Sequence, residues 1–232
     1  HLGQNEKAIN FYQQSLPIYQ ELKDRKEEAR VLNNLGYAYY NLGQYERAIN
    51  FYQQSLPIYQ ELKDREGEAN VLNNLGNVLN NLGFACNNVW QYERAIDFYE
   101  QSLPIYQELK DREGEATVLN NLGNVYQSLG QYEKQVDFYE QSLPIFRELK
   151  NREGEAQVLA SWGLAYHSLG QYERAINFYE QSLPIWQELK DRKGEALVLK
   201  RLGFAYDSLG QYKKAIDVLQ QSLPIYQELK DR

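Results

Sequence analysis

The stretch Val31-Leu-Asn-Asn-Leu-Gly36 decides the fold, because it returns along the chain at a regular interval. Identical copies lie at 71–76, 78–83 and 118–123, and altered copies lie at 158–163 and 198–203. Counted between the glycines at 36, 76, 123, 163 and 203, the spacings are 40, 47, 40 and 40 residues. A period of this length indicates a repeat protein, in which each unit packs mainly against its neighbours.

Each repeat reads as two helices. Apolar residues recur at steps of three and four within 29–42, which predicts an amphipathic helix that we name the A helix. Gly43 follows it as the expected left-handed stop, and Asp64 is the expected N-cap of the next A helix. A second helix, the B helix, is predicted at about 44–63. Its expected buried residues are Tyr45, Ala48, Ile49, Tyr52, Leu56, Tyr59 and Leu62.

Every B helix contains a proline, at positions 17, 57, 104, 144, 184 and 224. Proline removes one backbone donor and costs about 3 kcal/mol inside a regular helix. The apolar pattern nevertheless continues in phase beyond Pro57, at Ile58, Tyr59 and Leu62. We therefore favour one bent helix over two short ones.

The predicted chain is all-α, with about eleven helices and no strand pattern. We expect a single repeat domain over 1–232. It would comprise a half repeat at 1–25 and full repeats at 26–65, 66–112, 113–152, 153–192 and 193–232. The full repeats would each form an antiparallel pair of A and B helices.

The spacing of Leu35-Gly36, Tyr39, Ala48 and Tyr52 resembles that of tetratricopeptide repeats (TPRs). The 40-residue period is similar to the longer repeats of kinesin light chains and Pins-type adaptors, and the wording of the repeats is similar to bacterial, notably cyanobacterial, arrays. The resemblance implies a right-handed α-solenoid whose A helices line a concave, ligand-binding groove. The resemblance is more specific for the fold than for the function, because the same fold carries many different binding sites.

The second repeat is longer because a heptad is duplicated within 71–84. Seven residues turn a helix by almost two full turns, so the extra heptad can be absorbed with the apolar stripe nearly unchanged. We expect one A helix from about Glu66 to Asn88, about 10 Å longer than its siblings. The alternative is a bulge in which residues 84–90 loop out. Trp90 takes the place of the terminating glycine, so the turn that follows must differ.

Candidate binding residues lie three positions before, one after and four after each repeated glycine, on the face that the resemblance assigns to the groove. In the second repeat two registers are open, Asn73/Asn77/Asn80 or Asn80/Phe84/Asn87. The candidates are Asn33, Tyr37, Asn73, Asn77, Asn80, Asn120, Asn124, Gln127, His167, Lys200 and Phe204.

Asparagine offers both a donor and an acceptor, so a ladder of asparagines can pair with the backbone of an extended peptide. Kinesin light chains and Pins-type adaptors carry asparagines of this kind. The alternative is that the neighbouring Asn34, Asn74 and Asn121 only satisfy backbone groups between helices. Lys200 and Arg201 form a basic pair that could hold an acidic ligand group.

Composition excludes several classes of function. The net charge of -7 disfavours a nucleic-acid or anionic-membrane surface, and no apolar run approaches the ~20 residues of a membrane span. The single cysteine, Cys86, is compatible with a reducing, cytoplasmic location, and its place in the repeat predicts a buried thiol. We expect no metal site and no cofactor, because neither metal-ligand spacing nor a phosphate-binding loop occurs.

Catalysis has little support in the sequence. The only histidines are His1 and His167, and no GxSxG elbow accompanies them. His167 and Asp207 occupy equivalent positions in adjacent repeats, so contact between them is open. The sequence therefore predicts a non-catalytic scaffold that binds a protein or an extended peptide. The alternatives are a regulatory or sensory segment of a larger enzyme, and head-to-tail self-association through ends that lack polar capping helices.

Overall fold

The computed structural model describes residues 2–86 and 88–230, and these residues form eleven α-helices. The helices are α1 (Leu2–Glu21), α2 (Arg25–Asn41), α3 (Tyr45–Leu62), α4 (Arg65–Cys86), α5 (Val89–Leu109), α6 (Arg112–Ser128), α7 (Tyr132–Glu148), α8 (Arg152–Ser168), α9 (Tyr172–Leu189), α10 (Arg192–Ser208) and α11 (Tyr212–Lys230). The prediction of an all-α chain built from paired helices is confirmed.

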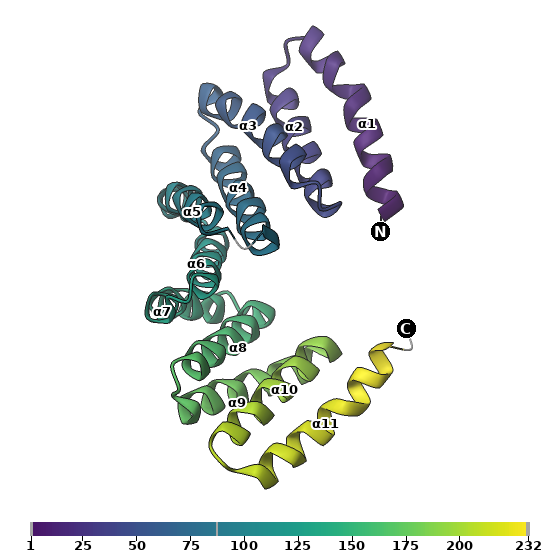
Figure 1. Ribbon diagram of the computed structural model, residues 1–232. Helices are drawn as coiled ribbons and strands as arrows, with labels where there is room; N and C mark the ends of the chain where they lie inside the picture. The colour runs from purple at the N-terminus through teal and green to yellow at the C-terminus, as the bar shows by residue number, and fades with distance from the viewer. Residues whose placement is uncertain (1, 87, 231–232) are drawn as a thin grey trace. The chain divides into compact units, whose positions relative to one another are not determined.

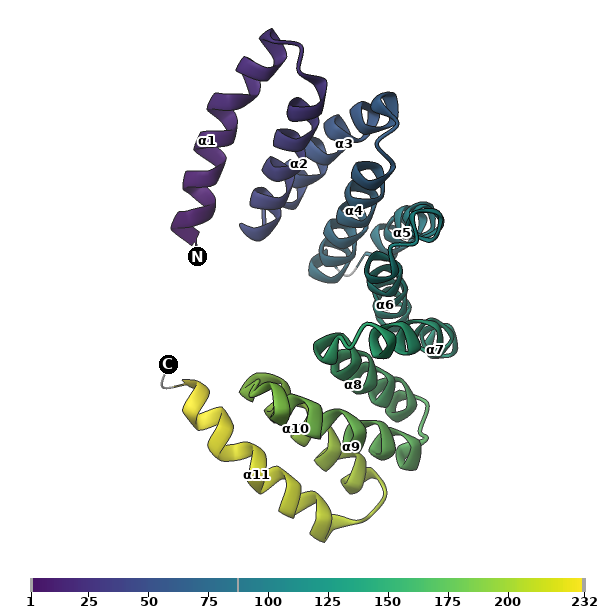
Figure 2. The same cartoon turned by 180° about the vertical axis from the view of Figure 1, so that it is seen from behind.

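The chain divides into two compact units, His1–Asn121 and Leu122–Arg232. Within each unit successive helices run in opposite directions and pack side by side (Figures 1 and 2). Adjacent A helices also touch, as α2 does with α4 and α8 with α10. The predicted organisation as a single domain, with its repeat boundaries, stays a prediction.

Buried aliphatic and aromatic side chains hold each helix pair together. On α2 the core residues include Ala29, Leu32 and Leu35, and on α3 they include Tyr52. Gly36 lies directly beneath the Tyr52 ring, because a Cβ built on this glycine would stand 2.6 Å from Tyr52 Cε1. The repeated glycine therefore serves the close approach of the two helices. Leu62 was predicted to be buried but is 40% exposed, because it is the last residue of α3.

The A and B helices end in different ways, and the sequence predicted only how the A helices begin and end. Gly43 has a φ of 71° and terminates α2 as expected, and the Asp64 side chain accepts a hydrogen bond from Gly67 N at 2.9 Å as the expected cap of α4. Five of the B helices (α1, α3, α5, α7 and α9) are followed instead by a lysine in the left-handed region, such as Lys63 with a φ of 55°. The B helices run unbroken through their prolines, so one helix is confirmed over two.

The long form of the second A helix is confirmed over the bulge. Helix α4 has 22 residues against 17 in α2, α6, α8 and α10, although it ends at Cys86 and not at Asn88. Asn88 instead caps α5, accepting a hydrogen bond from Trp90 N at 3.0 Å. The duplication is therefore divided between the end of α4 and an earlier start of α5. Asn87, the last residue of the register Asn80/Phe84/Asn87, lies outside the described residues.

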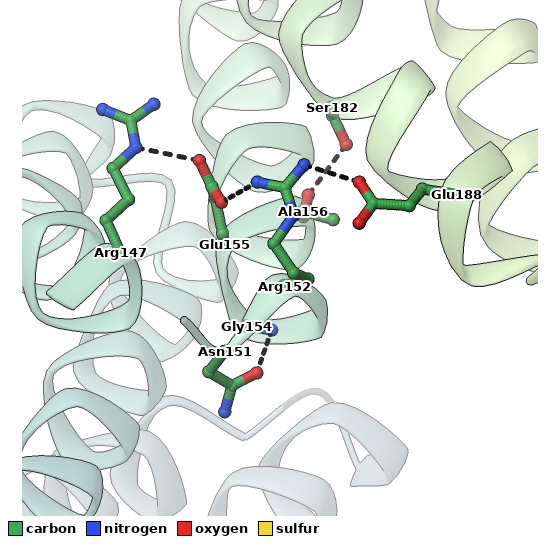
Figure 3. A network of polar contacts seen from close by, with 8 residues as sticks. All are labelled: Arg147, Asn151, Arg152, Gly154, Glu155, Ala156, Ser182 and Glu188. Atoms are coloured by element: carbon green, nitrogen blue, oxygen red, sulfur yellow. Dashed lines mark hydrogen bonds and ion pairs between the residues drawn. The ribbon is translucent and has the colours of Figure 1, made fainter. Parts of the chain in front are cut away.

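A repeated polar network joins α2, α4, α8 and α10 to the B helices on both sides. Figure 3 shows this network around α8. Arg152 of α8 pairs with Glu155 in its own helix and with Glu188 of α9 at 2.9 Å. Arg147 of α7 donates from Nε to the other Glu155 oxygen at 2.9 Å. In four other repeats a glutamine takes the place of Arg147 and donates to the equivalent glutamate: Gln20, Gln60, Gln107 and Gln187.

Candidate functional site

The A-helix face of the first unit carries a row of half-buried amide side chains. Asn33 lies on α2, and Asn73, Asn77 and Asn80 lie on α4. Tyr37 stands beside them with 56% of its surface exposed. Asn120 is also half-buried, on α6. The predicted asparagines of this unit are therefore neither fully buried nor fully exposed.

The duplicated motif uses its first copy in the role that the other repeats give to their single copy. Gly76 lies under the Tyr99 ring at 2.5 Å from the built Cβ, as Gly36 lies under Tyr52. Tyr99 also donates its hydroxyl hydrogen bond to Asn77 Oδ1 at 2.7 Å. Gly83 of the second copy instead packs against Tyr92 in the first turn of α5. The register Asn73/Asn77/Asn80 is thus the one that matches the siblings.

The second asparagine of the motif bonds to side chains. Asn74 donates to Asn33 Oδ1 at 3.3 Å, and Asn121 donates to the Oδ1 atoms of Asn73 and Asn77, both at 3.1 Å. The alternative that Asn74 and Asn121 satisfy backbone groups is therefore wrong. We name Asn33, Asn73, Asn74, Asn77 and Asn121 the amide ladder.

The duplication adds one more link beside the ladder. Asn81 donates to the Tyr40 hydroxyl at 2.7 Å, which joins the second copy of the motif to α2. Asn80 Oδ1 is buried and has no hydrogen-bond partner among the described residues. Asn80 therefore differs from Asn33, Asn73 and Asn77, whose side-chain oxygens each accept a hydrogen bond.

Two equivalent pockets lie beside this face, at the start of successive A helices. One of about 280 Å³ is lined by residues of α2 and α4, including Arg30, Glu66 and Asn70. The other, of about 250 Å³, is lined by Asn70 and Asn73 of α4 together with the first turns of α6. Tyr106 also lines the second pocket and donates to Asn70 Oδ1 at 2.7 Å. Asn73 thus belongs both to the ladder and to a pocket.

In the second unit, Asn124 and Gln127 are held by residues of α7. Tyr139 donates to Asn124 Oδ1 at 2.7 Å, and Gln135 Nε2 donates to Gln127 Oε1 at 3.0 Å. Burial raises the pKa of Tyr139 to about 12, so its hydroxyl keeps its proton near neutral pH. Gln135 is fully buried where the sibling B helices have alanine, such as Ala48. Side chains of α7 therefore orient both of these predicted residues.

His167 packs into its own helix pair. Its ring meets Tyr172 edge-on at 5.2 Å, and its Nε2 is buried without a hydrogen-bond partner among the described residues. No hydrogen bond or ion pair joins it to the exposed Asp207 in the part of the chain that the structure describes. This environment is suited to a neutral imidazole packed against a ring.

Acidification is expected to destabilise the second unit through His167. Burial lowers the pKa of this imidazole from its ordinary value near 6.5, so the unfolded chain takes up its proton at a higher pH than the folded chain. The stabilisation by neutral His167 is complete above pH 6.5 and is lost as the pH falls toward the folded-state pKa. Urea unfolding between pH 8 and 5 should show this loss, and His167→Gln, which copies Gln127, should reduce it. An unchanged pH dependence in the variant would contradict the assignment.

Lys200 and Phe204 lie one turn apart on α10 and contact each other. The Lys200 ammonium sits 5.7 Å from the centre of the Phe204 ring, and 48% of the Phe204 surface is exposed. Arg201 turns away from them and donates to the backbone oxygen of Ala160 at 3.4 Å. Only Lys200 of the predicted basic pair is therefore open to a ligand.

The prediction of a buried Cys86 thiol is wrong. Cys86 is exposed, as are Phe84 and Ala85, because the last turn of α4 extends beyond the contact of Gly83 with Tyr92. Among the residues that the structure describes, no group of three or more His, Cys, Asp or Glu side chains is placed to hold a metal ion. None of the described helices has the length and apolar character that crossing a membrane requires.

Sequence reasoning missed the residues that orient the candidate amides. Tyr99 and Tyr139 are the equivalents of Tyr52, which was expected only as a core residue, yet their hydroxyls bind Asn77 and Asn124. A signal was available, because an asparagine directly follows the repeated glycine in both repeats, at Asn77 and Asn124. Where Tyr37 follows the glycine, the structure gives no such bond to Tyr52 among the described residues.

Comparison with known proteins identifies the repeat. The tetratricopeptide repeat model matches residues 1–61, 27–80, 74–148 and 154–228. A comparison with curated proteins finds no match. Among solved structures, BtubC (BKLC) from P. vanneervenii is 22% identical with a TM-score of 0.82, over 98% of this chain and 93% of that one.

Two further structures share the fold at similarly low identity. A Podosopora anserina protein provisionally assigned as a kinesin light chain is 20% identical, with a TM-score of 0.69 over 88% of this chain and 97% of that one. The STAND protein PH0952 from Pyrococcus horikoshii, which has a tetratricopeptide repeat sensor, is 17% identical, with a TM-score of 0.76 over 97% of this chain and 34% of that one. These likenesses show an α-helical repeat fold. The family model covers most of the chain, and the chain therefore belongs to the tetratricopeptide repeat family.

Proposed function

We propose that this protein is a non-catalytic scaffold that binds an extended peptide segment of another protein on its A-helix faces. Members of the tetratricopeptide repeat family generally bind proteins or peptides. The observation that carries the proposal is the row of half-buried amides on α2 and α4, of which Asn73 also lines a pocket. Amide side chains at repeat spacing suit the repeating polar groups of a peptide backbone.

In the second unit the proposed contacts are chemically different. Asn124 and Gln127 offer amides, while Lys200 and Phe204 offer a cation and an exposed ring. Ala160 and Leu164 stand where other repeats have asparagine. We propose that this unit favours ligand side chains over backbone groups, and that the two faces contribute separately to specificity.

Binding to the first unit is expected to fall about tenfold or more when its ladder amides are removed, since each hydrogen bond lost leaves a ligand group unpaired. A random decapeptide library would be selected on the wild type, and the retained peptides titrated against an Asn73→Ala/Asn77→Ala variant. The matched control is Asn10→Ala/Asn50→Ala, which removes two exposed asparagines from B-type helices. Circular dichroism melting would confirm that each variant is folded. Equal affinity of every peptide for both variants would move the site off this face.

A sensory segment of a larger protein is the second candidate. The likeness to the STAND protein covers 97% of this chain and only 34% of that protein, which contains a tetratricopeptide repeat sensor. We propose this role as compatible with peptide binding, since a sensor also needs a ligand. Peptide binding by the isolated chain does not depend on which role applies, and a cytoplasmic location remains part of the proposal.

Head-to-tail self-association also stays a prediction. Exposed apolar side chains do lie on both terminal helices, including Phe11 and Ile18 on α1 and Ile216 and Leu223 on α11. Both of these are B helices, and within the two units the described B helices pack against A helices. Direct contact of α11 with α1 of another copy would therefore use a pairing that the chain does not use internally.

A further inference from the structure

The bonds of the amide ladder all run in one direction. Asn74 of α4 donates to Asn33 of α2, and Asn121 of α6 donates to Asn73 and Asn77 of α4. In each case the later helix supplies the N–H group and the earlier helix supplies the carbonyl oxygen. The second asparagine of the motif therefore fixes which end of the first asparagine faces inward.

Tyr99 strengthens this orientation at Asn77. The Tyr99 ring is fully buried, and its burial raises the phenol pKa well above the ordinary value, so the hydroxyl acts as a donor at neutral pH. Together with Asn121, it gives Asn77 Oδ1 two donors, which occupy both lone pairs of that oxygen. Rotating the Asn77 amide by half a turn would place its N–H groups against those of Asn121, while the Tyr99 hydroxyl would have to accept instead of donate.

An amide whose oxygen is bonded inside presents its N–H groups on the opposite side. Asn33, Asn73 and Asn77 are half-buried, and their Nδ2 atoms donate no hydrogen bond to any residue that the structure describes. We infer that Asn74 and Asn121 are positioning residues that hold these three amides with their donors toward the ligand. The first unit would then read the carbonyl oxygens of an extended peptide. This inference rests on the peptide-binding function proposed above.

Charge favours neutral carbonyl oxygens over carboxylates as the acceptors. Residues 1–121 contain 11 Lys and Arg against 17 Asp and Glu, a net charge of -6 out of -7 for the chain. The pocket that Asn73 lines also contains Asp111 and Glu113. A carboxylate placed there would be repelled, whereas a peptide backbone with basic side chains would be attracted. The ligand that fits is therefore an extended basic peptide bound through its backbone oxygens.

The direction of the ladder can be tested without a ligand. In deuterated wild-type protein with protonated amides, scalar couplings across hydrogen bonds should connect the Asn121 Nδ2 nitrogen to the Cγ carbons of Asn73 and Asn77. They should also connect Asn74 Nδ2 to the Cγ carbon of Asn33. Couplings in the reverse sense, from the nitrogens of Asn73 and Asn77 to Asn121 Cγ, would overturn the inference.

The effect on recognition can be tested with Asn121→Asp. A carboxylate at this position cannot donate, so Asn73 and Asn77 should turn their N–H groups inward and present oxygens to the ligand. The control is Asn34→Asp, which makes the same charge change at the same repeat position, where Asn34 has no hydrogen-bond partner among the described residues. Peptides selected on the wild type should bind Asn121→Asp about 10- to 100-fold more weakly and Asn34→Asp within about twofold of wild type.

Each outcome of the binding experiment has a separate meaning. Equal weakening in both variants would show an effect of charge and would overturn the positioning role. A selection enriched in Asp and Glu would overturn the preference for neutral oxygens. If the wild type retained no peptide, the proposed function would fail, while the couplings would still decide the direction of the ladder. Melting curves would show whether Asn121→Asp is folded, and the wild-type couplings do not depend on that variant.

Discussion

Replacement of Gly76 by alanine is expected to lower the free energy of unfolding by about 3 kcal/mol, at the upper end of overpacking costs. The new methyl group would stand 2.5 Å from Tyr99 Cε1, well inside contact distance. The ring cannot easily move away, because it is fully buried and its hydroxyl is bonded to Asn77. Relief of the clash therefore requires the separation of α4 and α5 or the loss of that bond. Urea unfolding followed by circular dichroism would measure the loss.

Two other glycines provide controls for Gly76. Gly203 occupies the same repeat position, but its built Cβ meets the aliphatic Leu219, which has rotamers available to move aside, so Gly203→Ala should cost less. Gly3 has no atom within 4 Å of its built Cβ, and Gly3→Ala should be neutral or slightly stabilising. A cost for Gly76→Ala no greater than that for Gly203→Ala would show that the anchored ring does not resist displacement.

The sequence was sufficient to predict the repeated features that depend on a few neighbouring residues. The period, the left-handed Gly43 and the Asp64 cap each depend on a few adjacent residues, and the structure contains all three. The repeated glycine at position 36 marks that period, and the structure shows that it lies directly beneath a ring of the neighbouring helix. The aromatic residue that makes this approach, Tyr52, was identified only as part of the core.

Features that depend on which atoms meet across helices could not be predicted. The pattern placed Asn74 and Asn121 between helices but could not show whether they bond to main chain or to the next asparagine. The exposure of Cys86 depended on where α4 ends relative to α5, and a duplicated heptad leaves that open. Lys63 adopts a left-handed conformation that its residue type does not favour, and the Asp64 N–H bond to Tyr59 O at 2.9 Å closes the turn around it.

Glu155→Ala is expected to cost about 2 kcal/mol, because Glu155 is the acceptor that links three helices. Its side chain is 10% exposed and bonds Arg147 of α7 through one oxygen and Arg152 of α8 through the other. Arg152 in turn reaches Glu188 of α9 (Figure 3). The two arginines are 49% and 40% exposed, so solvent would stabilise them after the substitution. This exposure keeps the expected cost below that of breaking a fully buried pair.

The comparison that isolates the inner carboxylate uses two matched variants. Glu188 is 58% exposed, so Glu188→Ala should cost less than about 1 kcal/mol and lose most of that effect in high salt. Arg147→Gln copies the glutamine that donates the same hydrogen bond at Gln187, so it should change stability little. If Glu155→Ala cost no more than Glu188→Ala in urea unfolding, the network would be a surface ion pair. A large loss of stability for Arg147→Gln would instead show that the guanidinium charge holds α7 to α8, and that a neutral donor in the same position does not suffice.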